Sequence, residues 1–344
     1  MRRLHPYLTL VFLCSSGVAL AQDIDFLKDL KPYRPEQKVS GTIRNWGNNY
    51  IPALMKDWEE GFQKYHPDIQ FETHLPGTET GMAGVYGGIA DLGFIGREVY
   101  REEHNAFVGV FGYEPTMIEI SSGSYATPHR TFSLQVFVHK DNPLAKLTLA
   151  ELDRIFGCGC IDSACEPIRK WGQLGLTGEW ADKPIHVYGY NFDTGMAGYF
   201  GKVVLNGSSK WNSELKDFDN GRDAKGEVIN AGVYVLRALE DDPYGIAYAN
   251  MMYGNSSVKA LALAHSVGGP YFEPTKENVW RRLYPITRYT TVVVNRVPGK
   301  PVDPKVREFL RYILSRDGMA AVVRDGAYLP LTEGLIEEQL RKLQ

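Results

Sequence analysis

The sequence predicts an α/β protein of two lobes, in which each lobe is a mostly parallel sheet flanked by helices and two chain crossings form a hinge. A strand, loop, helix and strand follow one another through residues 39–97, and a second strand, glycine-bearing loop and helix follow at residues 185–204. Two apolar strands, at residues 132–138 and 289–295, bracket the middle of the chain. Alternation of this kind is typical of sheets with helices on their faces. The bracketing strands indicate a first lobe that is built from both ends of the chain.

The first residues have the pattern of a secretory signal peptide. Arg2 and Arg3 precede an apolar run over residues 7–13, and a small-residue cleavage site follows at Ala19-Leu20-Ala21. The apolar run is too short to remain as a membrane-spanning helix, and no later stretch is long and apolar enough to cross a bilayer. We therefore expect a periplasmic or secreted mature protein with no stable membrane insertion.

The chain is divided, on this interpretation, into a signal peptide at 1–21, a lead-in arm at 22–38, a first lobe at 39–138 plus 286–344, and a second lobe at 139–285. The arm is rich in charge and contains two prolines, so we expect it to be loosely attached. The length of 344 residues and the apolar content of 44% suit two packed domains. Loss of the two signal arginines makes the formal charge of -3 more acidic, which leaves no electrostatic footprint for nucleic acid.

Three cysteines remain after the signal peptide, at Cys158, Cys160 and Cys165. An exported protein meets an oxidising compartment, where thiols pair. We predict one local disulfide, for example of Cys158 or Cys160 with Cys165, in an insertion that does not hold the fold together. A zinc site with an added histidine is the alternative, but no histidine lies nearby in the sequence.

The elements of the first lobe follow from apolar spacing. A strand is predicted at 39–43, a loop at 44–50 and a strand at 69–73, with a helix between them whose inner face is marked by Leu54, Trp58, Phe62 and Tyr65. The next stretch, residues 77–97, reads as loop, helix and buried strand. A helix start at Thr78–Gly81 would present unpaired N–H groups to an anionic or strongly polar ligand. The alternative is a glycine-rich connection that binds nothing.

The second lobe opens on a capping box, Thr148-Leu149-Ala150-Glu151, in which the Thr and Glu side chains each satisfy a backbone donor. A strand at 185–189 leads into the loop Asp193-Thr194-Gly195 and a helix. Later elements are predicted from apolar periodicity: a helix through Val233, Leu236 and Leu239, strands at 245–249 and 289–295, and a helix that stops near Gly318 and is lined by Val306, Phe309, Leu310, Ile313 and Leu314. Helix starts from both lobes would thus meet in a cleft.

Several segments, taken together and in order, resemble the phosphate-binding proteins of ABC transporters, a branch of the type II periplasmic binding proteins. The resemblance covers nearly the whole chain from about Val39 onward. It is carried by Asn142-Pro143-Leu144-Ala145, Leu147 to Gly157, Trp171-Gly172-Gln173-Leu174-Gly175, Asp193-Thr194-Gly195, Gly245 to Ala249, and Asp325 to Leu331. It implies the two-lobed type II fold and a solute bound between the lobes, with phosphate as the first expectation.

The resemblance also implies ligand-binding residues at matching positions. These are Asn49 and Tyr50 in the first loop, Thr78, Glu79 and Thr80 in the second, and Thr194 with Gly195 in the last. The family's acid falls at Gly96 and its buried arginine at Tyr190, so both phosphate-specific groups are missing at their aligned places. Arg97 is the candidate to replace the lost charge, unless it is a solvated surface arginine. Asp193 is interpreted first as a helix cap, and Glu79 is an unexpected acid beside the site.

The resemblance favours an extracytoplasmic solute-binding protein that takes a small anionic or polar ligand to an ABC transporter permease. The alternative is a scaffold or sensor that has lost phosphate binding and acts through a protein partner. We expect no enzyme activity, no cofactor and no metal. The chain has no Gly-x-Ser-x-Gly elbow, no His-Glu-x-x-His and no phosphate loop of the Gly-x-x-x-x-Gly-Lys type.

Overall fold

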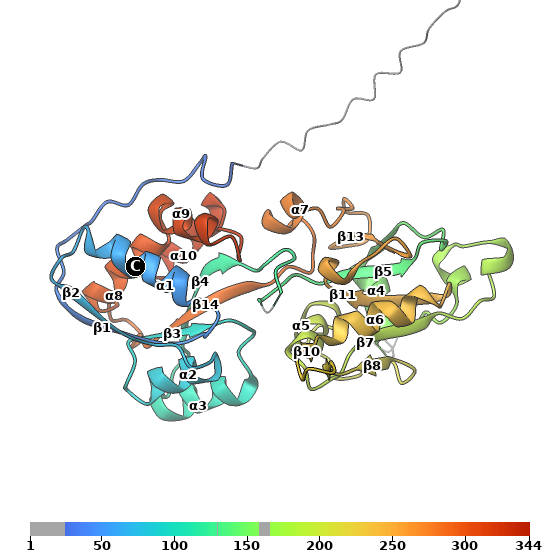
Figure 1. The fold of residues 1–344 in the computed structure, drawn as a ribbon, viewed down its shortest axis with the longest axis horizontal. Coiled ribbons are helices and arrows are strands. Elements are labelled where there is room, and N and C mark those ends of the chain that lie inside the picture. Colours follow the sequence, from blue (N-terminus) through green and yellow to red (C-terminus); the bar gives the residue numbers. More distant parts are fainter. Residues whose placement is uncertain (1–24, 129, 158–165) are drawn as a thin grey trace, which may run out of the picture.

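The computed structural model describes residues 25–128, 130–157 and 166–344. The predicted signal peptide and the three clustered cysteines lie outside these residues. The described chain forms two lobes, each built on one five-stranded sheet (Figure 1). The predicted two-lobed α/β fold is therefore confirmed.

The first lobe takes strands from both ends of the chain. Its sheet has the order β2-β1-β3-β14-β4, with β1 Gly41–Gly47, β2 Ile69–His74, β3 Leu92–Ile95, β4 Thr116–Ser122 and β14 Tyr289–Val294. Helices α1 (Pro52–Gln63), α8 (Pro304–Ile313), α9 (Arg316–Asp325) and α10 (Glu333–Arg341) cover one face, and α2 (Glu79–Tyr86) and α3 (Arg101–Phe111) cover the other (Figure 1). Each face has its own apolar cluster, centred on Phe62 and Phe309 under α1 and α8, and on Met82 and Phe107 under α2 and α3.

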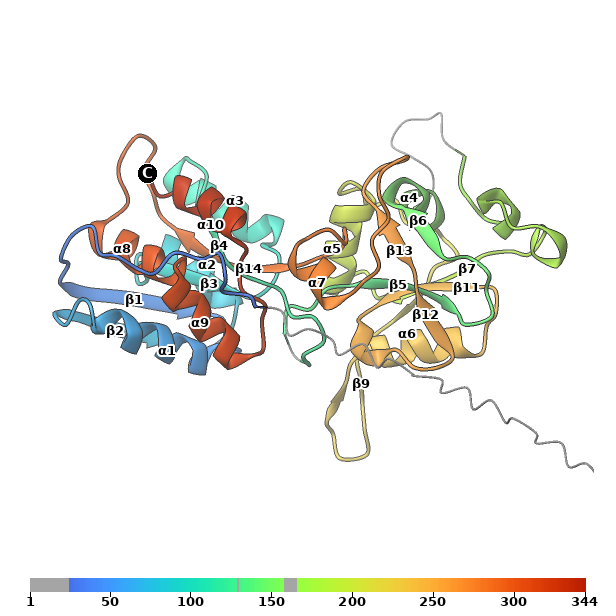
Figure 2. The same ribbon diagram turned by 90° about the horizontal axis from the view of Figure 1, so that it is seen from above.

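The second lobe is continuous from β5 to α7. Its sheet has the order β12-β5-β11-β7-β8, with β5 Gln135–His139, β7 His186–Tyr190, β8 Lys216–Phe218, β11 Gly245–Ala249 and β12 Val258–Ala260. Helices α4 (Leu149–Phe156) and α5 (Gly195–Val204) lie on one face and α6 (Ala231–Glu240) on the other (Figure 2). The smaller elements are β6 Lys146–Thr148, β9 Gly221–Arg222, β10 Val228–Ile229, β13 Ala262–Ala264, α7 Lys276–Trp280 and the 3₁₀ turns Trp171–Leu174, Gly178–Trp180 and Met251–Tyr253.

Three predictions about the strands and sheets need correction. Each sheet is mixed rather than mostly parallel, because β14 runs antiparallel to β3 and β4, and β5 runs antiparallel to β11 and β12. β14 returns from the second lobe at the sheet end where β4 leaves, so the two strands must run in opposite directions. β5 pairs in the second sheet, so residues 135–138 belong to the second lobe and the first crossing precedes them. The predicted loop at 44–50 is also shorter, since β1 extends to Gly47.

The two crossings are bonded to each other. Gly123 N–H donates to the carbonyl of Arg288 at 2.6 Å, and Leu134 N–H donates to the carbonyl of Ile286 at 3.2 Å. A Cβ at Gly123 would lie 2.4 Å from the carbonyl oxygen of Thr131 and 2.8 Å from that of Arg288. Only glycine therefore permits this close approach of the crossing segments. The hinge is a paired ribbon rather than two independent linkers.

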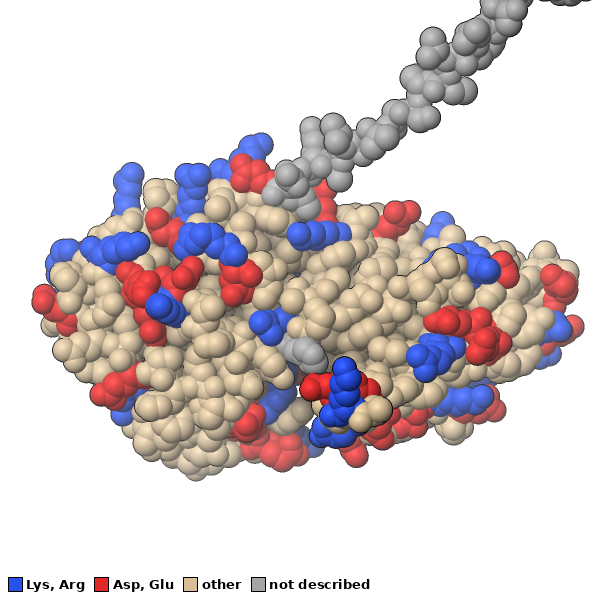
Figure 3. Space-filling model, viewed as in Figure 1, with Lys and Arg blue, Asp and Glu red and all other residues tan. Residues whose placement is uncertain are grey.

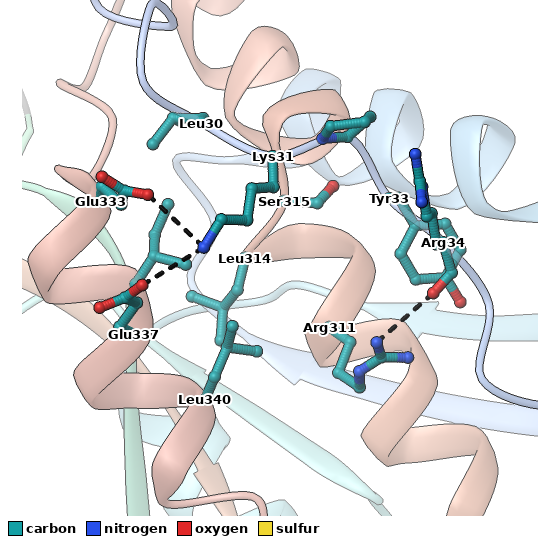
Figure 4. Close-up of a pocket in the computed structure, with 12 residues that line it drawn as sticks. Leu30, Lys31, Tyr33, Arg34, Arg311, Leu314, Ser315, Glu333, Glu337 and Leu340 are labelled. Atoms are coloured by element: carbon teal, nitrogen blue, oxygen red, sulfur yellow. Dashed lines mark hydrogen bonds and ion pairs between the residues drawn. The ribbon is translucent and has the colours of Figure 1, made fainter.

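The arm is anchored on the first lobe, contrary to the expected loose attachment. Leu30 and Tyr33 are buried in the cluster that underlies α8 and α10. The ammonium of Lys31 lies 3.6 Å from Glu333 and 3.4 Å from Glu337, and the arm thus closes over a pocket of about 450 Å³ (Figure 4). Phe26, nearer the start, packs edge-on against Trp280 at 4.9 Å between ring centroids. Trp280, Glu333 and Glu337 lie far from the arm in the sequence, so the composition of the arm does not reveal these partners.

Tyr33 joins the arm to a buried polar network. Its hydroxyl donates to Glu308 Oε2 at 2.6 Å and lies 2.8 Å from His66 Nε2, while Val39 N–H donates to His66 Nδ1. With Nδ1 occupied as an acceptor, Nε2 carries the proton of the neutral ring and donates to Tyr33. Burial lowers the pKa of His66 below its ordinary value of 6.5, and the charge of Glu308 offsets this only in part.

We expect this network to weaken in acid. The unfolded chain binds the His66 proton as the pH falls through about 6.5, whereas the folded protein binds it only at lower pH. The stability that neutral His66 contributes is thus complete above that pH and is lost as the pH falls toward the lower, folded pKa. Urea unfolding of the wild type and His66→Gln between pH 7.5 and 5.5 checks this. The wild type should lose more stability over that range than the variant, and equal losses would contradict the assignment.

One face of the molecule shows how its charged side chains are distributed. Figure 3 shows Lys, Arg, Asp and Glu side chains interspersed on the face that it draws. Because charges of both signs are mixed on this face, recognition of a charged ligand there depends on local pockets rather than on one large field.

Among the described residues no helix is long and apolar enough to cross a membrane.

Candidate functional site

A pocket of about 530 Å³ lies between the lobes and receives residues from both of them. Its lining comes from the loops after β1 and β3, the starts of α2, α5 and α6, the first crossing, and the β9–β10 hairpin. We call it the cleft pocket. Its lining residues are Asn49, Tyr50, Pro76, Gly77, Thr78, Glu79, Gly96, Arg97, Tyr100, Arg130, Thr131, Phe132, Gly195, Met196, Asn220, Val228, Asn230 and Arg288.

The start of α2 forms one wall. Thr80 and Gly81 N–H groups turn back to the carbonyls of Gly77 and Thr78 at 3.1 Å, which leaves the N–H groups of Thr78 and Glu79 without an acceptor in the described chain. The Thr78 hydroxyl accepts from Gly96 N–H at 3.2 Å and keeps its own proton for a ligand. This wall is the predicted helix start, with donors that face the pocket and the positive end of the helix dipole behind them.

The first loop is shaped by Gly47 and Asn48. Gly47 has φ +126, and a Cβ there would lie 2.1 Å from the carbonyl oxygen of Phe94, so only glycine fits between β1 and β3. Asn48 is buried and its side chain accepts from Tyr50 N–H at 3.0 Å. Asn49 and Tyr50 are thereby presented at the exposed rim of the pocket, where the guanidinium of Arg130 lies 5.5 Å from the centroid of the Tyr50 ring.

The second lobe contributes two helix starts. Thr194 caps α5, since its hydroxyl accepts from Ala197 N–H at 3.2 Å and donates to the carbonyl of Asn191 at 2.7 Å. Asn230 caps α6 by accepting from Gly232 N–H at 2.9 Å, and Asn220 accepts from Ala231 N–H at the same distance. Three helix starts, of α2, α5 and α6, therefore converge on one pocket.

Three arginines, Arg97, Arg130 and Arg288, line the cleft pocket. Arg97 binds Glu103 in a bidentate pair at 2.7 and 2.8 Å and stacks on Tyr100 at 3.8 Å. Arg288 is 3% exposed and binds Glu98 at 2.9 and 2.5 Å. Burial lowers the pKa of the Arg288 guanidinium, but the charge and hydrogen bonds of Glu98 outweigh this and hold that pKa above its ordinary value. Arg130 belongs to the first crossing, beside Thr131, whose hydroxyl donates to the carbonyl of Gly96.

The structure brings together some of the residues that the sequence predicts for the site. Asn49, Tyr50, Thr78, Glu79, Arg97 and Gly195 all line the cleft pocket. Arg97 is a cleft residue with a half-buried ion pair, not a solvated surface arginine, but its guanidinium is already engaged by Glu103. It is therefore not free to replace the positive charge that the aligned positions lack.

Four predicted residues do not line the pocket. Tyr190 is 1% exposed and lies in the core of the second lobe, where burial holds its pKa well above the ordinary value. Thr80 donates to the carbonyl of Gly77, and Thr194 uses its hydroxyl for capping α5. Asp193 is exposed and is not the cap of α5, because the cap is the next residue. Tyr190, Thr80 and Thr194 therefore pack in the core or hydrogen-bond to the backbone, although they align with ligand-binding positions of the family.

Residues that the sequence interpretation missed supply much of the polar lining. These are Arg130 and Thr131 in the crossing, Arg288 before β14, and Asn220 and Asn230 near α6. Asn230 had a local signal, because an asparagine directly before an apolar-periodic helix is a favoured cap. Arg130 and Arg288 had no local sequence signal, because only the pairing of the two crossings brings them to the pocket.

Comparison with known proteins adds sequence relatives and solved structures. A family model described as the PBP superfamily domain matches residues 34–317. The phosphate-binding protein PstS of Pseudomonas aeruginosa is 31% identical over 344 residues, which cover 100% of this chain and 99% of the relative.

Among solved structures, PstS from Borrelia burgdorferi has a TM-score of 0.54 at 16% identity and covers 86% of this chain and 100% of its own. An ABC-type phosphate transport receptor from Vibrio cholerae has a TM-score of 0.50 at 17% identity and covers 83% of this chain and 99% of its own. At such low identity these two structures support the fold alone.

Proposed function

Because this chain belongs to the phosphate-binding protein family of the PBP superfamily, we propose that it binds inorganic phosphate in the cleft pocket and delivers it to the permease of an ABC transporter. The observation that carries the proposal is the convergence of three helix starts and three arginines on one pocket between the lobes. A phosphate anion is held by N–H donors, hydroxyls and charge-assisted bonds, and this lining offers all three. The relative from Pseudomonas aeruginosa is named for the same ligand.

Periplasmic or extracellular location is part of the proposal and rests on the signal-peptide pattern before Gln22. The role is one of binding, not of catalysis, as in the relatives' names. The polar lining of the cleft pocket gives the alternative of a ligand-free scaffold no support.

We propose that Arg130 contacts the bound phosphate, because it lines the cleft pocket from the hinge segment between the two lobes. Its guanidinium lies 5.5 Å from the centroid of the Tyr50 ring at the rim of that pocket. A guanidinium at the hinge can reach a ligand held by helix starts of both lobes.

Arg130→Ala should raise the Kd for phosphate about 10- to 100-fold, since a hydrogen bond to a charged group contributes about 1.5–3 kcal/mol. Arg130→Lys should recover part of the loss because it restores charge without the planar fork. Isothermal titration calorimetry on the mature protein measures both, with Arg281→Ala as the control, because Arg281 is an exposed arginine whose ion pair is with Glu277. No phosphate binding by the wild type, in a protein that melts cooperatively, would refute the proposed function.

The Glu79 carboxylate allows the pocket to distinguish an anion that carries a proton from one that does not. It lies at the start of α2 within the lining, and a carboxylate there can only accept a hydrogen bond. Phosphate near neutral pH still carries a proton to donate, whereas sulfate carries none. Sulfate would therefore place charge against an unpaired carboxylate, which polar sites reject strongly.

Glu79→Gln should raise sulfate affinity at least about tenfold and lower phosphate affinity, because an amide can donate to either anion. Competition of each anion against labelled phosphate measures the ratio. Asp193→Asn, which removes a nearby acid outside the lining, should leave the ratio unchanged. If the ratio of phosphate affinity to sulfate affinity is the same in wild type and Glu79→Gln, another group distinguishes the two anions.

A further inference from the structure

We propose a second anion site in this protein, in a pocket beside the cleft pocket, which binds a small organic polyanion between the two lobes. This pocket has a volume of about 510 Å³. The start of α3, strands β4 and β14 and the C-terminal Lys342 form its first-lobe side, and Lys202 of α5 comes from the second lobe. We call it the α3 pocket. Arg97 lines both pockets, so the segment around it separates them.

The α3 pocket carries positive charge that the protein does not balance. Its two acids are already paired, Glu98 with Arg288 at 2.5 Å and Glu119 with Arg282 at 2.5 Å. Neither of these arginines lines the α3 pocket, so the acids do not cancel the cations that do.

The cations that line the α3 pocket differ in the ion pairs and hydrogen bonds that they form within the protein. Arg97 is bound by Glu103, and Lys342 donates to Gln339 Oε1 at 2.7 Å and lies 3.7 Å from Glu338. Arg101 and Lys202 have neither an ion pair nor a side-chain hydrogen bond among the parts of the chain that the structure describes. Both are exposed and both line the pocket. A guanidinium and an ammonium from different lobes therefore line one cavity, and no acid among the described residues pairs with either of them.

The rest of the lining indicates what kind of anion fits. Pro115, Met117 and Tyr289 form an apolar wall, and Val99 adds to it. An inorganic anion would leave this wall unused, whereas a short carbon body with two or more carboxylate or phosphate groups would contact the wall and both cations. The volume suits a ligand of that size and exceeds what one inorganic anion needs. The ligand class is thus a small organic polyanion.

Citrate is a suitable probe because it combines three carboxylates with a short carbon body. Binding should be measured by calorimetry in the presence of saturating phosphate, so that the cleft pocket is occupied, and again in Arg130→Ala, which impairs the cleft pocket. Citrate should bind in both settings, and its affinity should fall as the salt concentration rises. Because the second setting needs no phosphate binding, the proposal for the α3 pocket and the proposed function can fail separately.

Lys202→Ala and Arg101→Ala should each raise the citrate Kd about tenfold and leave the phosphate Kd unchanged. Both side chains are exposed, so the melting temperature without ligand should not change, and Lys210→Ala serves as an exposed lysine control near α5. Citrate binding that is absent in the presence of phosphate, or that is the same in both pocket variants as in wild type, would overturn the proposal.

Discussion

Arg288→Met should destabilise the folded protein by about 3 kcal/mol or more, because it removes one partner from a largely buried ion pair. Arg288 is 3% exposed and Glu98 has a side-chain exposure of 20%. The guanidinium also donates to the sulfur of Met196 at 3.3 Å and lies 5.4 Å from the centroid of the Tyr199 ring. One side chain therefore connects the β3–α3 loop of the first lobe, the hinge and α5 of the second lobe. Urea unfolding gives the free energy directly.

The stability lost in Arg288→Met should come mainly from the Glu98 carboxylate, which is left without its partner. Glu98→Gln in the same background should then recover part of the stability, and a double-mutant cycle should give a coupling well above 1 kcal/mol. Arg281→Ala is the matched control, because it breaks an exposed pair with Glu277 at 2.9 Å and should cost less than about 1 kcal/mol. If Arg288→Met costs no more than Arg281→Ala, the pair does not join the lobes energetically.

Glu308→Ala should cost about 3–5 kcal/mol, since Glu308 is fully buried and is the shared acceptor of the arm's anchor. Its oxygens accept from Arg311 at 2.9 Å, from the Tyr33 hydroxyl at 2.6 Å and from Glu36 N–H at 3.4 Å. Removing it leaves a cation and a hydroxyl with unmet hydrogen bonds inside the first lobe. The arm should also become more open to proteolysis, which mass spectrometry of the cleavage products can measure.

Two variants bracket the effect of Glu308. Glu308→Gln keeps an acceptor of the same shape and should cost less than Glu308→Ala. Glu36→Ala removes the half-exposed partner of Arg307 and Arg311, so it should cost about 1 kcal/mol or less. A similar small cost for Glu36→Ala and Glu308→Ala would contradict the view that burial makes this network the anchor.

Local sequence signals predicted the elements whose causes are local. The apolar spacing of Leu54, Trp58 and Phe62 corresponds to the buried face of α1. The Thr148–Glu151 capping box forms as predicted, with the Thr148 hydroxyl accepting from Glu151 N–H at 3.2 Å. The strand at 245–249 has the predicted bounds. Caps and periodic faces depend on residues within a few positions of one another, so they can be read from the chain itself.

The candidate site was only partly predictable, because some of its residues are placed by local signals and others by contacts between distant parts of the chain. The donors of the α2 start are local, and Thr78 was found from its loop. Tyr190 was aligned to a site position, yet its strand turns the side chain into the core, and a strand's inward and outward faces alternate with every residue. Arg130 and Arg288 lie 158 positions apart and meet at one pocket because the two crossings pair.

The sequence by itself determined the two-lobed α/β class, several of its helices and strands, and the α2 start that offers N–H groups to an anion. Those features follow from short-range spacing and from the need to bury one face of each element. Tertiary structure alone decided the mixed sheets, the anchoring of the arm and the presence of Arg130 and Arg288 in the cleft pocket. Each of these depends on contacts between residues far apart in the chain, such as Tyr33 with Glu308 and Glu98 with Arg288, and such contacts exist only once the lobes and the hinge have formed.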